Sequence, residues 1–120
     1  MFHAADSPIG PGPLEPGDLI YAIGDVHGRA DLLDRLYRRI RAHAADAAPG
    51  RRLVVHLGDY VDRGPDSRGA IDRVMAPPLP GFASVALLGN HEALMLGFLQ
   101  EPVELGPGWM ANGAAATMAS

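Results

Sequence analysis

Three short apolar segments, each stopped by a glycine, recur along this sequence. They are Leu19–Ile23, Leu53–Leu57 and Ser84–Leu88. Segments of this length and composition are typical of strands buried on both faces of a sheet. Helical patterns separate them, with leucines at helical spacing between 32 and 40 and a shorter helix over 67–75. The alternation of strand, helix, strand, helix and strand predicts right-handed crossovers and a parallel sheet, which is an α/β fold.

The remaining helices follow from local patterns. The first helix should end near residue 43, a third should cover 90–100, and the stretch from 109 onward can begin another. Two ion pairs at i,i+4 spacing are expected on the polar side of the first helix: Asp31 with Arg35, and Asp34 with Arg38.

Composition excludes several classes of function. At 120 residues the chain suffices for one small domain or part of a larger one. Without lysine there is no Walker A loop, and without cysteine there is no disulfide scaffold, thiolate zinc site or cysteine nucleophile. A net charge of −4 without a basic cluster argues against a nucleic-acid partner. No apolar run reaches membrane-spanning length, so we expect no membrane partner and a cytoplasmic location.

The first 17 residues differ from the rest of the chain. They contain four prolines and three glycines and show no hydrophobic periodicity. We therefore predict a disordered or extended leader over 1–17, followed by a domain over 18–120.

Polar residues follow each apolar segment, and parallel strands place their carboxyl ends at one edge, where ligands bind. Asp25 and His27 follow the first segment, two positions apart. On an extended backbone they would point to one side and suit a divalent transition metal. The alternative is an Asp–His turn that binds no metal.

The second cluster begins with Asp59, directly after a predicted buried strand, where an unpaired carboxylate is costly and a metal would relieve the cost. Asp62 and Arg63 have two interpretations. They form a surface ion pair, or Asp62 orients a catalytic imidazole while Arg63 binds a phosphate group through its planar guanidinium.

In the third cluster Asn90 is either a metal ligand through its carbonyl oxygen or the N-cap of the next helix. His91 is either a general acid or a histidine at the helix start with no role in catalysis. For Glu92, a favourable interaction with the helix dipole is a sufficient explanation. The combined inventory fits hydrolysis of a phosphate ester by a metal-activated hydroxide. Four residues would form a two-metal centre: Asp25, His27, Asp59 and Asn90. Asp59 would bridge the two metals, and Arg63 and His91 would lie at the rim of the centre.

The three clusters read GDVHG at 24–28, GDYVDRG at 58–64 and GNHE at 89–92. They resemble the N-terminal signatures of the calcineurin-like metallophosphoesterases, and more narrowly of the phosphoprotein phosphatase family of Ser/Thr phosphatases. PDSRG at 65–69 is similar to the bacterial members, and Trp109, Asn112-Gly113 and Thr117 resemble the segment that follows in them. The resemblance spans 19–120 and implies the βαβαβ half of a β-sandwich flanked by helices.

The resemblance also implies a metal centre. Asp25 and His27 would hold the first of two divalent ions, Asp59 would bridge, and Asn90 would bind the second. Mn²⁺ is the expected metal, with iron or zinc as alternatives. Family members are longer and supply further His ligands to the second metal from the part that follows. The remaining histidines of this chain match no family ligand; they are His3, His43 and His56. The second metal site is therefore incomplete.

For catalysis, the resemblance implies that His91 protonates the leaving alkoxide, that Asp62 is hydrogen-bonded behind it, and that Arg63 binds the phosphoryl oxygens. The expected reaction is two-metal hydroxide attack on a phosphomonoester, in a phosphoprotein or a small phosphoester. The chain as it stands is expected to be weakly active or inactive.

Two alternatives remain. The symmetrical dinucleoside-tetraphosphate hydrolases are similar in the first cluster, although Asp62 and Glu92 favour the phosphoprotein branch. The other alternative is a remnant that binds metal or phosphate without turnover. Because the second sheet of the family is missing, exposed apolar side chains should promote self-association: Leu94, Leu96, Phe98 and Trp109.

Overall fold

The structure is a computed structural model that describes residues 12–120. Most of the predicted leader, and His3 with it, therefore lies outside the described residues. The described end of the leader, 12–17, is irregular and mostly exposed. It contacts the domain at Gly17, whose carbonyl oxygen accepts a hydrogen bond of 2.6 Å from Arg52.

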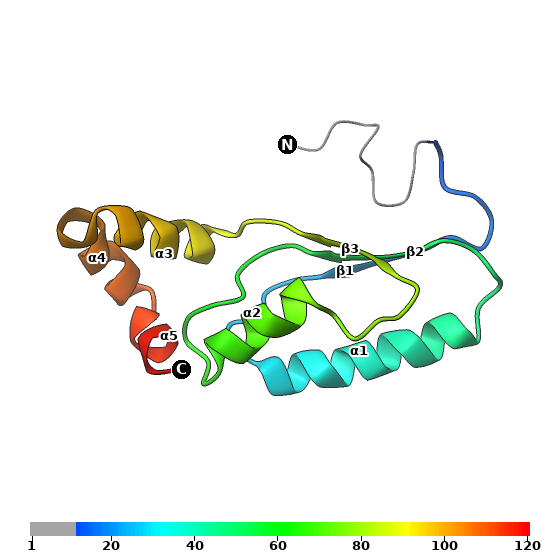
Figure 1. Cartoon of the computed structure of the whole chain (residues 1–120), viewed down its shortest axis with the longest axis horizontal. Coiled ribbons are helices and arrows are strands. Elements are labelled where there is room, and N and C mark those ends of the chain that lie inside the picture. Colours follow the sequence, from blue (N-terminus) through cyan, green and yellow to red (C-terminus); the bar gives the residue numbers. More distant parts are fainter. Residues whose placement is uncertain (1–11) are drawn as a thin grey trace.

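A three-stranded parallel sheet forms the centre of the chain, with the strand order β1-β2-β3. The strands are β1 (Leu19–Ile23), β2 (Arg52–His56) and β3 (Ala83–Ala86). Their register aligns Tyr21 with Val54 and Val54 with Ser84. All three carboxyl ends therefore lie at one edge, on the side of the third helix (Figure 1). The predicted α/β fold with a parallel sheet is confirmed.

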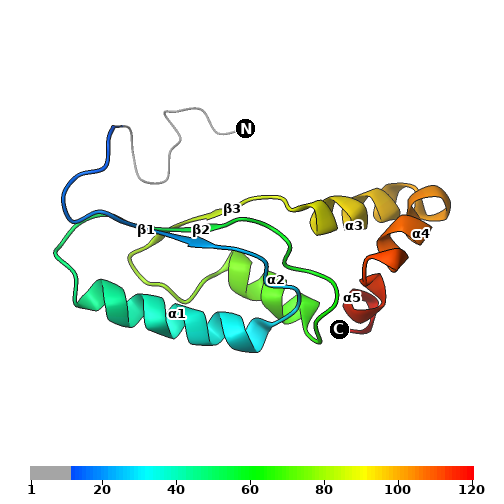
Figure 2. The ribbon, with the colours of Figure 1, turned by 180° about the vertical axis from the view of Figure 1, so that it is seen from behind.

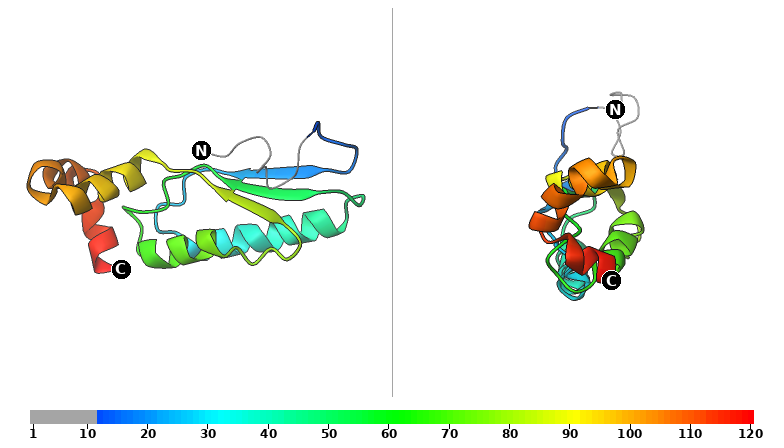
Figure 3. Two further views of the ribbon diagram at one scale, coloured as in Figure 1. Left: turned by 45° about the horizontal axis from the view of Figure 1, so that its top comes forward. Right: turned by 90° about the vertical axis from the view of Figure 1, so that its left-hand side faces the viewer.

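Two helices cover one face of this sheet. They are α1 (Ala30–Ala45) and α2 (Ser67–Met75), and both views place them on the same side (Figures 1 and 3). Strands that follow one another in sequence order place their crossover helices on one face when the crossovers share one hand. The core between sheet and helices is built from the residues that point inward: Ile23, Leu33, Tyr37, Ile40, Val54, Ala70 and Val74.

The other face of the sheet contradicts the prediction of strands buried on both faces. Burial alternates along β1, and the side chains of Ile20, Leu57 and Leu87 are 45%, 50% and 45% exposed. The described residues provide no second layer over these side chains. The apolar runs are long enough for strands buried on both faces of a sheet. In the described residues, however, only the face covered by α1 and α2 has helices packed against it.

The last three helices continue beyond the carboxyl edge of the sheet (Figure 2). They are α3 (Asn90–Gln100), α4 (Pro102–Ala111) and α5 (Ala114–Ala119). The helix expected from 109 onward thus begins earlier, with a proline in the first turn where its missing N–H costs nothing. It is interrupted at Gly113, whose φ of 99° breaks the helix before α5. The chain then folds back so that its C-terminus lies beside α2 (Figure 1).

Two expectations about side chains are wrong. Trp109 is only 3% exposed, so it does not belong to an exposed apolar patch, whereas Leu96 is 44% exposed as expected. The ion pairs of α1 also differ, because both acids find partners outside the i,i+4 pattern. Asp31 pairs with Arg29 at 2.7 Å, and Asp34 pairs with Arg73 of α2 at 2.7 Å, which joins the two helices.

His56 at the end of β2 is fully buried, and only one of its two ring nitrogens has a hydrogen-bond partner. Its Nε2 lies 2.7 Å from the Tyr37 hydroxyl, while its Nδ1 has no hydrogen-bond partner. Burial lowers the pKa of the imidazole below its ordinary value, because a charged ring would lose its hydration there. The same burial raises the pKa of the Tyr37 hydroxyl.

The pKa of His56 predicts a pH-dependent stability. The unfolded chain binds a proton at a higher pH than the folded chain, so the free energy of unfolding should fall as the pH drops through about 6.5. Urea unfolding at pH 7.5 and 5.5 should show a smaller loss for His56→Gln than for the wild type, by up to about 1 kcal/mol per pH unit. The exposed His43→Gln serves as control, and an equal pH dependence in wild type and His56→Gln would contradict the assignment.

Candidate metal and catalytic site

The backbone of the site is unusual. Among residues 12–120, four that are not glycine adopt a positive φ: His27 at 43°, Asp59 at 57°, Asp62 at 73° and Arg63 at 69°. All four belong to the predicted site. Such conformations cost of order 1 kcal/mol or more each and persist only when surrounding contacts hold them. The strain of this fold is thus concentrated where the polar side chains converge.

The loops after β1 and β2 are joined through their main chains. The amides of Val26 and His27 both donate to the Asp59 carbonyl oxygen at 2.9 Å. Gly28 donates to the Tyr60 carbonyl oxygen at 2.8 Å. At Gly64 the loops approach so closely that an added Cβ would clash with the main chain of His27. The two loops therefore form one unit at the carboxyl edge of the sheet.

Asp25, His27 and Asp59 form a cluster of possible metal ligands. One ligand atom from each lies within 4.8 Å of the other two, and His27 Nε2 lies 3.7 Å from Asp25 Oδ2. His27 reaches this position through a left-handed turn, not through the extended backbone that the sequence spacing predicted. Its Nδ1 donates to the Val61 carbonyl oxygen at 2.8 Å, which leaves the lone pair of Nε2 directed at the cluster.

This donor set fits a divalent transition metal. Two carboxylates and one imidazole whose Nε2 carries no proton match the ligands that Mn²⁺, iron and zinc accept. Asp59 lies between the loops, since its Oδ1 also accepts a 3.0 Å hydrogen bond from the His91 amide of α3. The described chain thus offers three ligands to one metal.

Asn90 is exposed at the start of α3. Gly89, not Asn90, is the N-cap, so the capping interpretation is wrong. The Asn90 side chain makes no hydrogen bond within residues 12–120 and is free to bind a ligand. Together with Asp59 it gives two candidate ligands for a second metal. Of the other histidines, His56 of β2 is buried against Tyr37 of α1 and His43 contacts the Tyr21 hydroxyl at 2.7 Å, so neither contributes to the cluster.

Glu92 does more than favour the helix dipole. Its Oε2 accepts hydrogen bonds from the amides of Gly89 and Asp59 at 3.0 and 2.7 Å. Its Oε1 accepts hydrogen bonds from the amides of Tyr60 and Val61 at 2.6 and 3.1 Å. One buried carboxylate therefore holds the second loop against the start of α3, and the prediction of a dipole role alone is wrong. Burial and the neighbouring Glu92 charge raise the pKa of Tyr60 to about 12.

His91 and Asp62 form a buried pair next to the metal cluster. His91 Nδ1 lies 2.7 Å from Asp62 Oδ2, and the Asp62 side chain is completely inaccessible to solvent. On its other side the His91 ring packs edge-on against His27, with 4.6 Å between the ring centroids. Because Nδ1 faces Asp62, Nε2 is the nitrogen left to act elsewhere.

Arg63 is exposed at the rim of the cluster. Its Nη1 lies 3.4 Å from His27 Nε2, and its amide donates to the Gly113 carbonyl oxygen at 3.2 Å. The alternative of a surface ion pair with Asp62 is wrong, because Asp62 is buried and its carboxylate is directed at His91. The guanidinium is free to approach an anion bound beside the metal ligands.

Sequence reasoning missed three further residues around Asp62. The Trp109 indole donates to both Asp62 oxygens, at 3.0 and 2.9 Å, and the Thr117 hydroxyl donates to Oδ1 at 2.6 Å. Ser67 Oγ accepts from the Asp62 amide at 3.1 Å. The sequence carried one signal for them, because Trp109 and Thr117 lie in the last of the matched segments. Their contacts with Asp62 could not be read from the spacing.

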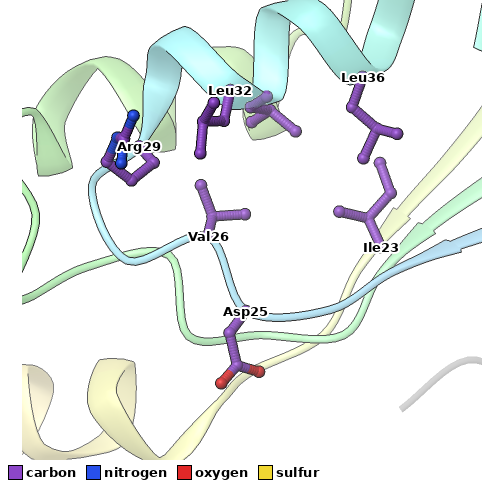
Figure 4. A pocket seen from close by; sticks show the side chains of 7 residues that line it. Ile23, Asp25, Val26, Arg29, Leu32 and Leu36 are labelled. Carbon is purple, nitrogen blue, oxygen red and sulfur yellow. The ribbon is translucent and has the colours of Figure 1, made fainter. Parts of the chain in front are cut away.

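A cavity of about 270 Å³ lies on the opposite side of the first loop. Figure 4 shows its apolar side chains between β1 and α1, while the Asp25 carboxylate points away from them. The cavity is therefore lined mainly by apolar side chains, and the Asp25 carboxylate does not point into it. Its lining consists of Ile23, Asp25, Val26, Arg29, Leu32, Leu33 and Leu36.

Comparisons with known proteins show which family this chain belongs to. The family model for calcineurin-like phosphoesterases matches residues 19–116. Serine/threonine-protein phosphatase 2 of Escherichia coli is 38% identical over 96 residues, which cover 78% of this chain and 38% of that protein. The symmetrical bis(5'-nucleosyl)-tetraphosphatase of Delftia acidovorans is 37% identical over 81 residues, 68% of this chain and 26% of that protein.

Among solved structures, a cold-active protein-tyrosine phosphatase from a psychrophilic Shewanella overlays with a TM-score of 0.48 at 24% identity. The overlay covers 82% of this chain and 34% of that one. The chain is an α/β protein with candidate metal ligands in the loops at the carboxyl edge of its parallel sheet. The family match over most of the chain then shows that it belongs to the calcineurin-like phosphoesterase family. The chain spans less than two fifths of these relatives.

Metal binding should depend on the cluster described above. Calorimetric titration with Mn²⁺ should show one site, and Asp25→Asn or Asp59→Asn should weaken its affinity at least about tenfold, because each removes a charged ligand. Asp72→Asn, an exposed acid on α2, is the matched control and should bind like the wild type. Unchanged affinity in both cluster variants would contradict the assignment.

Glu92→Gln tests the carboxylate that holds the second loop. The amide nitrogen of glutamine would face two main-chain donors, and buried amides without an acceptor cost roughly 1–3 kcal/mol each. Urea unfolding should therefore show a loss of about 2–6 kcal/mol. The exposed Glu104→Gln of α4 should change the free energy of unfolding by less than about 0.5 kcal/mol, and similar effects of the two substitutions would argue against this role.

Proposed function

We propose that this chain supplies the metal-binding and proton-donating part of a metal-dependent phosphomonoesterase of the Ser/Thr phosphatase type. One observation carries the proposal: the buried His91–Asp62 pair packs directly against a metal-ligand cluster, with Arg63 beside it. The family match and the 38% identity to the Escherichia coli phosphatase support the same reaction class.

In this proposal Asp25, His27 and Asp59 hold the first metal, and Asp59 and Asn90 contribute to the second. Mn²⁺ is the proposed ion, with iron or zinc as alternatives. Divalent metals at such centres neutralise phosphoryl charge and activate water for attack on phosphorus. Since the described residues offer only two ligands to the second metal, we expect that ion to bind loosely.

The protein side chains have separate tasks. Arg63 binds the non-bridging phosphoryl oxygens through its planar guanidinium. Protonated His91 delivers the proton on Nε2 to the leaving oxygen, which would otherwise depart as a costly alkoxide. Asp62 accepts the Nδ1 proton of His91, fixes the ring and stabilises its positive charge. The proposed substrate class is a phosphoprotein or small phosphomonoester.

A second substrate class has a specific observation in its favour. The Delftia acidovorans relative, named as a symmetrical bis(5'-nucleosyl)-tetraphosphatase, is almost as similar in sequence to this chain. The two classes are separated by assaying a phosphoserine peptide against a dinucleoside tetraphosphate. Binding of Mn²⁺ without turnover of either substrate would instead support the non-catalytic alternative.

Two other properties remain proposals. Within the described part of the chain no helix is long and apolar enough to cross a membrane; a cytoplasmic location stays a prediction. Self-association through exposed apolar side chains also stays a prediction, and the open sheet face and α3 supply such side chains: Ile20, Leu57, Leu87, Leu96 and Leu99.

Catalysis by this chain alone should be at least about a hundredfold slower than by an intact relative, because a loosely held second metal misplaces the reacting groups. The assay is Mn²⁺-dependent hydrolysis of an aryl phosphate. Joining the chain to the unmatched C-terminal part of the Escherichia coli relative should restore chelator-sensitive activity. His91→Asn should reduce that activity at least about a hundredfold.

Two outcomes would contradict this picture. Full activity of the unjoined chain would show that it supplies a second-metal ligand beyond Asp59 and Asn90. An active fusion that is unaffected by His91→Asn would show that His91 is not the proton donor. His43→Asn, at an exposed position on α1 remote from the cluster, is the matched control.

A further inference from the structure

The Asp62 carboxylate is surrounded by hydrogen-bond donors. Oδ2 faces His91 Nδ1 at 2.7 Å and the Trp109 indole at 2.9 Å. Oδ1 faces the same indole at 3.0 Å and the Thr117 hydroxyl at 2.6 Å. A carboxylate is an acceptor only, so it can satisfy all three side chains. Each carboxylate oxygen thus accepts two hydrogen bonds, and these bonds fix the orientation of the carboxylate.

Counting protons shows which way the hydroxyl groups point. Thr117 Oγ1 lies 2.6 Å from Asp62 Oδ1, an acceptor, so the single Thr117 proton is committed there. The Thr117 oxygen then accepts from the Asp62 amide at 2.8 Å and from the Ser67 hydroxyl at 3.0 Å. The hydrogen bonds therefore run in one direction, from the Ser67 hydroxyl to Thr117 and from Thr117 to the Asp62 carboxylate. Thr117 is thereby bonded to both the amide and the side chain of Asp62.

These donors come from far along the sequence. Trp109 lies 47 residues after Asp62 on α4, and Thr117 lies 55 residues after it on α5. The Phe98 ring of α3 packs against the indole, with 5.1 Å between the ring centroids. The Gly113 carbonyl oxygen between the two helices accepts from the Arg63 amide at 3.2 Å. The α4–α5 segment therefore contacts Asp62 and Arg63, two residues held at positive φ.

We propose that Trp109 and Thr117 are positioning residues for the proton donor, an inference that rests on the proposed function. They fix both oxygens of Asp62, and Asp62 in turn holds the proton of His91 on Nδ1. This leaves Nε2 as the nitrogen presented to the substrate. Without the two donors the carboxylate gains rotational freedom, and the neutral His91 ring can place its proton on either nitrogen.

The test measures the His91 imidazole directly in the metal-free, ¹⁵N-labelled chain by nuclear magnetic resonance at pH 8. The wild type should show one tautomer, with the proton on Nδ1 exchanging slowly with water. Trp109→Phe keeps an aromatic ring and Thr117→Val keeps the shape, but each removes one donor. We expect the Nδ1 proton to exchange at least about tenfold faster in either variant, and a second tautomer to appear when both are combined.

Two matched variants separate positioning from packing. Thr117→Ser retains the hydroxyl and should keep exchange within about twofold of the wild type. Phe98→Leu alters the packing of the indole but leaves its N–H in place, and it should behave the same way. Backbone amide spectra report whether each variant folds. If Trp109→Phe fails to fold, the Thr117→Val and Thr117→Ser pair still decides.

Wild-type exchange in a folded Thr117→Val chain would overturn the inference. So would an equal acceleration in Thr117→Ser and Thr117→Val, because the hydroxyl would then not be the cause. The measurement needs no metal and no turnover. Failure of the proposed function, seen as an inactive fusion, is therefore recognised separately from failure of this inference.

Discussion

The geometry of the site depends on one carboxylate. Glu92 accepts four main-chain hydrogen bonds, one from its own helix start and three from consecutive residues of the second loop. The hydrogen bond from the Asp59 amide to Glu92 fixes a residue with positive φ. The Asp59 side chain also accepts a hydrogen bond from the His91 amide. Charge-assisted bonds of this kind are among the stronger ones in proteins, and here they offset the backbone strain of the loop.

A second buried acid completes the arrangement in a different way. Glu92 binds only main-chain amides and determines where the loop runs, whereas the Asp62 carboxylate binds only side-chain donors and orients the His91 ring. Burying a carboxylate is tolerated only when its oxygens are fully paired. Both acids meet that condition, which explains how two charges can lie within a few residues of the metal cluster.

Much of this structure could be predicted from local sequence patterns. The strands, the parallel sheet and the meeting of three polar clusters follow from apolar runs and their order, since parallel strands must share a carboxyl edge. The coverage of the sheet could not be predicted, because an apolar run such as Leu53–Leu57 does not say which of its faces will find a partner. The roles of Glu92, Trp109 and Thr117 depend on contacts between distant residues, and neither composition nor periodicity encodes those contacts.

The contacts of Asp62 with α4 and α5 have a consequence for the order in which the site is assembled during synthesis. Chains are made from the N-terminus, and the β1–β2–β3 unit can form while later residues are still inside the ribosome. Thr117 emerges last among the groups that contact Asp62. A nascent chain can thus expose its candidate metal ligands before the His91 ring is held in place, so the sheet can fold before the contacts around Asp62 are complete.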